Sequence, residues 1–133
     1  MEVALGVVLH RDPADGVARV LISRRPAAAA LGGLWEFPGG KTENGESAEA
    51  CVVRELREEL GIEVRPTAVL GVIRHDYEHA AVTLRPYHCE WVSGRPQKRG
   101  VADWAWADAK ALGTYRFPPA NDGLLVEVRG LLK

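Results

Sequence analysis

The chain has 133 residues, of which 47% are hydrophobic and 26% charged, so we expect one globular domain over residues 1–133. A net charge of -1 argues against a protein that coats nucleic acid, because binding to the phosphate backbone rewards a strongly basic surface. Two cysteines without metal-type spacing, no apolar run of membrane length and no leader-like start predict a cytoplasmic protein that binds no membrane.

The first third of the chain predicts a hairpin followed by loops. Residues 3–9 and 17–23 are rich in β-forming residues, and turn formers at 11–16 separate them. Two antiparallel strands are therefore expected. Residues 27–30 and 36–45 are predicted as loops, because proline and glycine interrupt or flank both stretches.

Residues 47–60 form the strongest helix candidate. Apolar residues recur every four positions and would form one stripe: Ala48, Val52, Leu56 and Leu60. Gly61 follows as a natural C-terminal stop. We therefore expect an amphipathic helix that packs on a sheet.

The second half of the chain predicts strands and a closing helix. Residues 68–77 and 81–92 are β-rich, residues 103–107 suit a short strand, and residues 119–132 carry apolar side chains at helical spacing. Three side chains on one strand face, His75, Tyr77 and His79, either line a cleft or form a second metal site. The order of elements favours an α/β or α+β sandwich.

Three glutamates lie beside the apolar stripe of the expected helix. At about 100° per residue, Glu55, Glu58 and Glu59 fall within an arc of roughly 100°. Crowded carboxylates repel one another, and a hard cation such as Mg²⁺ removes that penalty. Arg54 can orient or neutralise one of the acids. An exposed acidic helix face remains the alternative interpretation of these residues alone.

The whole segment from Gly40 to Ile62 resembles the Nudix box, G-x5-E-x7-R-E-U-x-E-E-x-G-U with U apolar, at every specified position. This resemblance implies a Nudix α/β/α sandwich with a mixed sheet and a loop-helix-loop. It also implies hydrolysis of a nucleoside diphosphate joined to another group, with Mg²⁺ or Mn²⁺. By the match, the metal ligands are Glu55, Glu58, Glu59 and the backbone oxygen of Gly39. Glu46 is an additional acid, Arg54 its catalytic neighbour and Glu55 the expected general base.

Outside the box, residues 22–25, 34–41 and 117–121 resemble the branch of the family that includes bacterial MutT. That resemblance implies that Asn121 recognises the base, since an amide offers both a donor and an acceptor. It places Arg25 and Glu36 near the nucleotide, and Trp35 beside the glycine-rich loop is a further candidate for substrate contact. The loop after Val92 departs from this branch, because its residues 97–100 contain no carboxylate for an additional metal ligand.

Three functions follow from these observations. The first is a nucleoside triphosphate pyrophosphohydrolase that converts an oxidised purine nucleotide such as 8-oxo-dGTP to the monophosphate and pyrophosphate. That activity would cleanse the nucleotide pool before DNA replication and so avoid mutation. The second is a pyrophosphohydrolase for CTP, 5-methyl-dCTP or a broad set of nucleotides. The third is a non-catalytic Nudix-fold binding module. We expect a monomer or homodimer without stable nucleic-acid binding.

Overall fold

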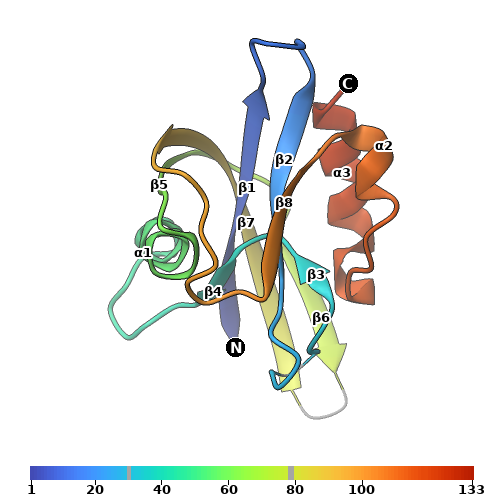
Figure 1. Ribbon diagram of the computed structural model, residues 1–133. Helices are drawn as coiled ribbons and strands as arrows, with labels where there is room; N and C mark the ends of the chain where they lie inside the picture. The colour runs from blue at the N-terminus through green and yellow to red at the C-terminus, as the bar shows by residue number, and fades with distance from the viewer. Residues whose placement is uncertain (30, 78–79) are drawn as a thin grey trace.

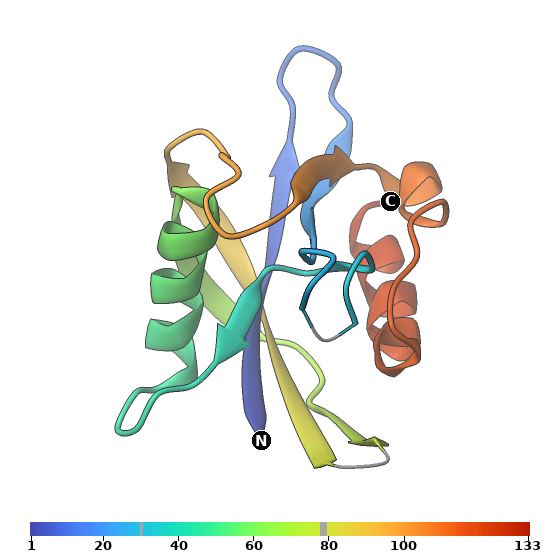
Figure 2. The same cartoon turned by 60° about the horizontal axis from the view of Figure 1, so that its bottom comes forward.

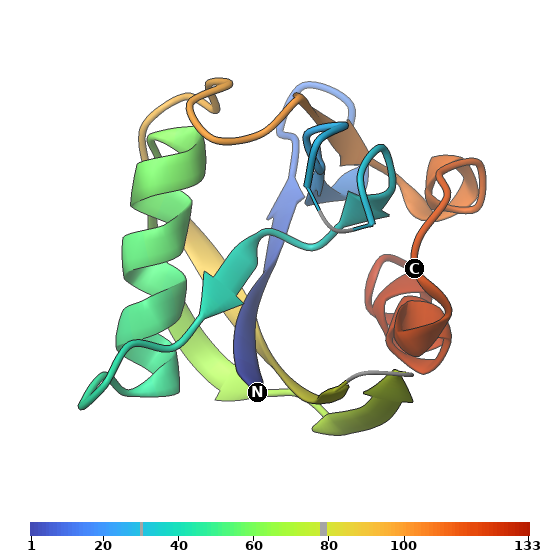
Figure 3. The same cartoon turned by 90° about the horizontal axis from the view of Figure 1, so that it is seen from below.

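A mixed sheet lies between helices on its two faces (Figures 1 and 3). The computed structural model describes residues 1–29, 31–77 and 80–133. Helix α1 (Ala48–Leu60) covers one face, and α2 (Ala109–Leu112) and α3 (Asp122–Leu131) cover the other. This arrangement confirms the expected α/β/α sandwich. No helix in the described part of the chain has the length and apolar content needed to cross a bilayer.

Strand β1 is the centre of the sheet. The strands are β1 (Glu2–Arg11), β2 (Ala18–Arg24), β3 (Trp35–Glu36), β4 (Gly39–Lys41), β5 (Glu63–Val69), β6 (Ile73–Tyr77), β7 (Ala80–Ser93) and β8 (Asp103–Ala107). One edge of β1 pairs in parallel with β7. Its other edge pairs antiparallel with β4 at residues 3–5 and with β2 at residues 9–11. Strands β4 and β2 therefore diverge from each other along this edge of β1, and β3 pairs with β2 beside the gap.

Alternation along β1 divides the core between the two faces. Leu5 and Val7 join the buried cluster that packs against α2 and α3. Ala4 and Val8 join the cluster under α1, which the predicted stripe of α1 completes. Every second residue of an extended strand points to the same face, so β1 can serve both clusters. Burial of both faces explains why the strand reads as an almost continuous apolar run.

Helix α1 has the ends that its sequence predicts. The side chain of Ser47 accepts a hydrogen bond from the backbone N–H of Ala50 at 3.1 Å, which caps the first turn. Gly61 ends the helix with a φ of 70°, a left-handed conformation that glycine adopts without strain. The fixed ends of α1 set the rotation of its acidic face relative to the sheet.

Four features of the structure differ from the sequence prediction. The expected loop at 36–45 contains β4 and follows the short strand β3, because pairing with β1 and β2 organises these few residues. The expected strand at 68–77 is divided into β5 and β6, which both pair with β7, because the register along β7 shifts by one residue between the pairs Val69–Tyr87 and Ile73–Leu84. The closing helix begins with a 3-10 turn at Pro119–Asn121, and α2 was not predicted. Of the loop at 27–30, residue 30 lies outside the described residues.

Gly6 permits the close approach of α1 to β1. A Cβ atom at Gly6 would lie 3.0 Å from Leu56 Cδ2 and 3.2 Å from Val52 Cγ1. We expect Gly6→Val to lower the free energy of unfolding by about 2 kcal/mol, because the added side chain overpacks a full core. Chemical denaturation measures this change. Gly123→Val is the matched control, since a Cβ there has open space, and an equal loss in both variants would contradict the explanation.

Candidate active site

Arg54 holds several carboxylates around one guanidinium. Its Nε and Nη2 donate to both oxygens of Glu46 at 2.7 and 2.9 Å. Its Nη1 donates to Glu55 at 2.9 Å and to Glu58 at 3.2 Å. The fork of Arg54 thus neutralises acids from both the loop and the helix, which would otherwise repel one another.

Glu46 fixes the loop that precedes α1. It accepts the two hydrogen bonds from Arg54 and a third, at 3.1 Å, from the backbone N–H of Glu43. The hydrogen bonds from Arg54, and then the one from Glu43, lower the pKa of Glu46 to about 2. The carboxylate therefore stays ionised across the physiological pH range and can keep the loop docked on the helix.

Glu55 lies directly over Gly40. A Cβ atom at Gly40 would be 2.5 Å from Glu55 Cδ, so any side chain there would displace the carboxylate. A Cβ atom at Gly39 would be 2.0 Å from the carbonyl oxygen of Ala4. The two glycines therefore permit two close approaches, of β4 to β1 and of Glu55 to β4.

Glu59 lies deeper than the other acids of α1. Its Oε2 is buried and has no hydrogen-bond partner among the described residues. Burial first, and then the charges of Glu55 and Glu36, raise the pKa of Glu59 to about 8. At neutral pH Glu59 is therefore mainly protonated in this arrangement, and a positive charge nearby would favour its ionisation.

Glu36 and Arg25 form the opposite side of the acid cluster. Arg25 Nη1 donates to Glu36 Oε1 at 3.0 Å, and the side chain of Glu36 is 19% exposed. Burial raises the pKa of Glu36, and the charge and hydrogen bond of Arg25 oppose that shift. The structure thus arranges Glu36, Glu59 and Glu55 between two arginines.

Sequence reasoning gave no role to Ser23, which the structure places beside this cluster. Ser23 pairs with Glu36 across β2 and β3 and is fully buried. Its hydroxyl has no hydrogen-bond partner among the described residues. The sequence does contain a clue to this position. Leu21 faces α1, so Ser23, two residues further along the strand, faces the same side, where a small polar residue is unusual.

The loop after β7 supports the end of α1 that carries Glu59 (Figure 2). The backbone N–H groups of Arg99 and Gly100 donate to the Glu59 carbonyl oxygen at 3.1 and 3.0 Å. This loop supplies no carboxylate at residues 97–100, and Asp103 lies 3.7 Å from Lys98 Nζ. The loop therefore holds the backbone of the acidic helix in place.

Trp35 packs on the core cluster of the α3 side, and Asn121 lies in the 3-10 turn that precedes α3. The ring of Trp35 packs against Tyr115 with centroids 4.7 Å apart. Asn121 is 6% exposed, and its amide nitrogen donates to the carbonyl of Pro118 at 3.4 Å. Their substrate contacts stay predictions. His79 lies outside the described residues, so a second metal site with His75 also stays a prediction.

The acids suit a hard divalent cation by their chemistry. Glu55 and Glu59 interact closely, and the buried Oε2 of Glu59 has no partner among the described residues, so a carboxylate oxygen remains for coordination. The described side chains nevertheless form no ready group of three or more acidic, histidine or cysteine ligands. Glu58 instead accepts a hydrogen bond from Arg54, and its side chain is 59% exposed. Metal coordination by Glu55, Glu58 and Glu59 therefore stays a prediction.

Known proteins resemble this chain over most of its length. Residues 7–127 match the model of the NUDIX domain. The 8-oxo-dGTP diphosphatase of Escherichia coli (strain K12) is 30% identical over 131 residues, 98% of each protein. The CTP pyrophosphohydrolase of the same strain is 31% identical over 121 residues, 91% of this chain and 86% of that protein. The solution structure of the E. coli ORF135 protein has a TM-score of 0.76 and 32% identity, covering 98% of this chain and 89% of that chain.

The layered fold and the glutamate-bearing helix define a hydrolase class whose members generally use a divalent metal ion. The chain belongs to the Nudix family and is a Nudix hydrolase with strong similarity to the MutT-like 8-oxo-dGTP diphosphatases. The family membership that the Nudix-box resemblance between Gly40 and Ile62 predicted is thus confirmed.

The raised pKa of Glu59 predicts a pH dependence of stability. Between its ordinary value of 4.5 and about 8, the folded state binds a proton that the unfolded state has lost, so stability falls as pH rises through this window. Glu59→Gln should flatten the decline measured by denaturation without divalent metal. Glu58→Gln, at an exposed position of the same helix, serves as the control. An unchanged slope in Glu59→Gln would contradict the assignment.

Proposed function

We propose that this protein is a metal-dependent nucleoside triphosphate pyrophosphohydrolase that uses Mg²⁺ or Mn²⁺. The observation that supports this proposal most strongly is the paired carboxylates of Glu55 and Glu59, one with a buried oxygen that lacks a partner. Similarity to the two E. coli relatives, both named for nucleotide hydrolysis, supports the same chemistry. The products are a nucleoside monophosphate and pyrophosphate.

The proposed reaction adds water across the bond between the α- and β-phosphates. Glu55, Glu58, Glu59 and the backbone oxygen of Gly39 would hold a divalent cation, which would supply positive charge beside the phosphate oxygens. Glu55 accepts the proton of the attacking water as general base. The water oxygen joins phosphorus, and the phosphoanhydride oxygen leaves with the second product. Arg54 keeps Glu55 and Glu46 oriented throughout, and Glu46 remains ionised.

For the base, we propose an oxidised purine such as that of 8-oxo-dGTP. Asn121 presents an amide whose donor and acceptor can pair with a purine edge, and Arg25, Glu36 and Trp35 are the further proposed substrate contacts. The relative named 8-oxo-dGTP diphosphatase spans 98% of this chain. This activity would cleanse the nucleotide pool of the cytoplasm and lower misincorporation during DNA replication.

The second candidate is a pyrophosphohydrolase for CTP or 5-methyl-dCTP, or one with broad preference. The CTP pyrophosphohydrolase of E. coli is 31% identical to this chain over 121 residues, and the 8-oxo-dGTP diphosphatase is 30% identical. Sequence identity therefore favours the two candidates about equally. Both candidates use the same acids. They differ only in the base that the α3 side of the molecule accepts.

Removing one acid at a time tests the chemistry. Glu55→Gln and Glu58→Gln should each lower turnover by at least about a hundredfold, since the amide cannot accept a proton or neutralise a cation as a carboxylate does. Pyrophosphate release with Mg²⁺ measures turnover, and thermal melting shows that the fold is intact. Normal turnover in either variant would remove that residue from the mechanism.

A panel of nucleotides tests the base. Equal concentrations of 8-oxo-dGTP, dGTP, CTP and 5-methyl-dCTP should give a preference for 8-oxo-dGTP in kcat/KM. Asn121→Asp should reduce that preference at least about tenfold, because the carboxylate lacks the amide donor. Its kcat for dGTP serves as an internal control. Cytidine-biased rates in the unaltered protein would establish the second candidate instead.

A further inference from the structure

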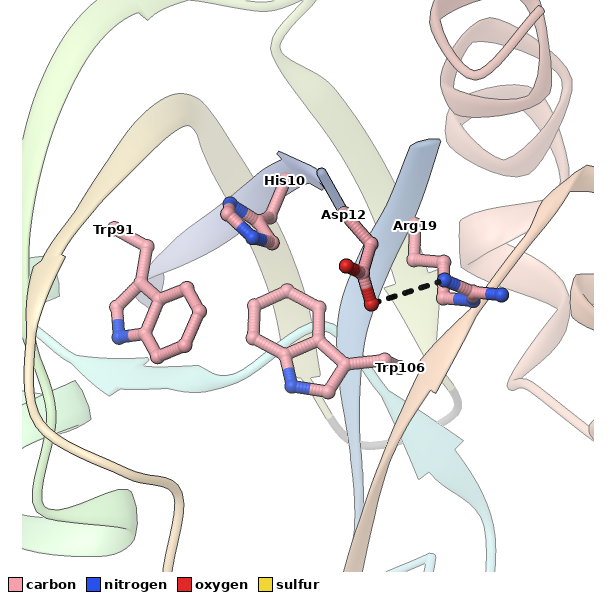
Figure 4. Close-up of a pocket in the computed structure, with 5 residues that line it drawn as sticks. All are labelled: His10, Asp12, Arg19, Trp91 and Trp106. Atoms are coloured by element: carbon pink, nitrogen blue, oxygen red, sulfur yellow. Dashed lines mark ion pairs between the residues drawn. The ribbon is translucent and has the colours of Figure 1, made fainter. Parts of the chain in front are cut away.

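A pocket lies away from the acids, where β1 ends and β2, β7 and β8 pass beside it (Figure 4). It has a volume of about 460 Å³ and is lined by His10, Asp12, Arg19, Trp91 and Trp106, which we call the aromatic pocket. Small-molecule sites are commonly of this size and combine apolar rings with a few polar groups. None of the proposed catalytic or substrate residues lines it.

The aromatic pocket is distinct from the proposed active site. Gly40, over which Glu55 lies, pairs with Ala4 on β1. From Ala4 to His10 the strand advances about 20 Å at about 3.3 Å per residue. A ligand in the aromatic pocket therefore occupies a site separate from the acid cluster.

Three rings form one wall of the aromatic pocket. The centroids of Trp91 and Trp106 are 5.2 Å apart, and the ring of His10 lies edge-on to Trp91 at 4.9 Å. Both tryptophans pack on the core cluster under α1 and remain partly exposed. Because the rings contact one another, they offer a surface for stacking and leave no open space between them for a caged cation.

Asp12 supplies hydrogen-bond acceptors beside this wall. One oxygen accepts the backbone N–H of Ala14 at 2.8 Å, and the other lies 3.8 Å from Arg19. A carboxylate has about four acceptor positions, so Asp12 retains acceptors for a ligand. Arg19 itself is bound by Asp15 at 2.8 Å, which leaves Asp12 as the carboxylate at the pocket that can pair with N–H donors.

We propose that the aromatic pocket is a second nucleoside site, which stacks a guanine-type base on Trp106 and Trp91 and pairs its N–H edge with Asp12. A planar base matches the ring wall, and adjacent N–H donors on one edge match the two oxygens of a carboxylate. The ligand is a free nucleoside or the base of a small nucleotide. This site is independent of the proposed hydrolysis and goes beyond it.

NMR of the indole N–H groups tests the proposal in the unaltered protein. Each of the four tryptophans gives one signal, and Trp35 reports separately on the neighbourhood of Glu36. Guanosine, which has no phosphate, should shift the signals of Trp91 and Trp106 saturably and leave Trp35 unchanged. Adenosine, which lacks the paired N–H edge, should bind at least about fivefold more weakly.

Two aspartate variants sharpen the test. Asp12→Asn should weaken guanosine binding at least about tenfold, since a hydrogen bond to a charged group is lost. Asp15→Asn is the matched control, because Asp15 also accepts a backbone N–H two residues ahead and also contacts Arg19, yet does not line the pocket. Its affinity should stay within about twofold, a change smaller than one neutral hydrogen bond. Pyrophosphate release should be unchanged in both variants, which separates this test from that of the proposed function.

Four results would overturn the proposal. The first is the absence of any saturable shift at Trp91 and Trp106 with guanosine. The second is a shift confined to Trp35, which would place nucleoside binding elsewhere. The third is equal affinity in Asp12→Asn and the unaltered protein. The fourth is a response of the same signals to tetramethylammonium but not to guanosine, which would make the aromatic pocket a cation site.

Discussion

Repulsion between carboxylates is the constraint on which the acidic side of this molecule depends. Arg54 reduces this repulsion by donating hydrogen bonds to Glu46, Glu55 and Glu58 at the same time. Glu59 lies beyond the reach of that guanidinium, and burial keeps it protonated instead, with a pKa of about 8. Pairing with an arginine reduces the repulsion at Glu55, and protonation reduces it at Glu59, one turn further along the same helix.

The close packing around α1 follows from the same requirement. The carboxylates can share Arg54 only if the loop that carries Glu46 lies against the helix, and this brings β4 under Glu55. Gly40 and Gly39 permit these contacts because any side chain would collide with Glu55 or with the backbone of Ala4. The charge arrangement therefore requires the two glycines of β4 indirectly, because a larger side chain at either position would prevent the close packing.

Much of this arrangement could be predicted from sequence, and the limits have physical causes. The four-residue apolar spacing and Gly61 defined α1, and the box spacing identified the acids. The short strands β3 and β4 could not be predicted, since tertiary pairing and not local propensity organises strands of two or three residues. The burial of Glu59 and of Ser23 depends on the packing of distant elements. The aromatic pocket likewise joins His10, Trp91 and Trp106 from three strands that are far apart in sequence.

The placement of Asn121 and Trp35 on the α3 side, with the glutamates on the α1 side, has an evolutionary consequence. Under the proposed roles, the 3-10 turn before α3 carries the base contact Asn121, and α1 carries the acids that act on the phosphates. Substitutions around the 3-10 turn can then change the accepted nucleotide without disturbing the hydrogen bonds of Arg54. Under the same roles, related proteins can differ in nucleotide preference while they share the acids that cleave the bond.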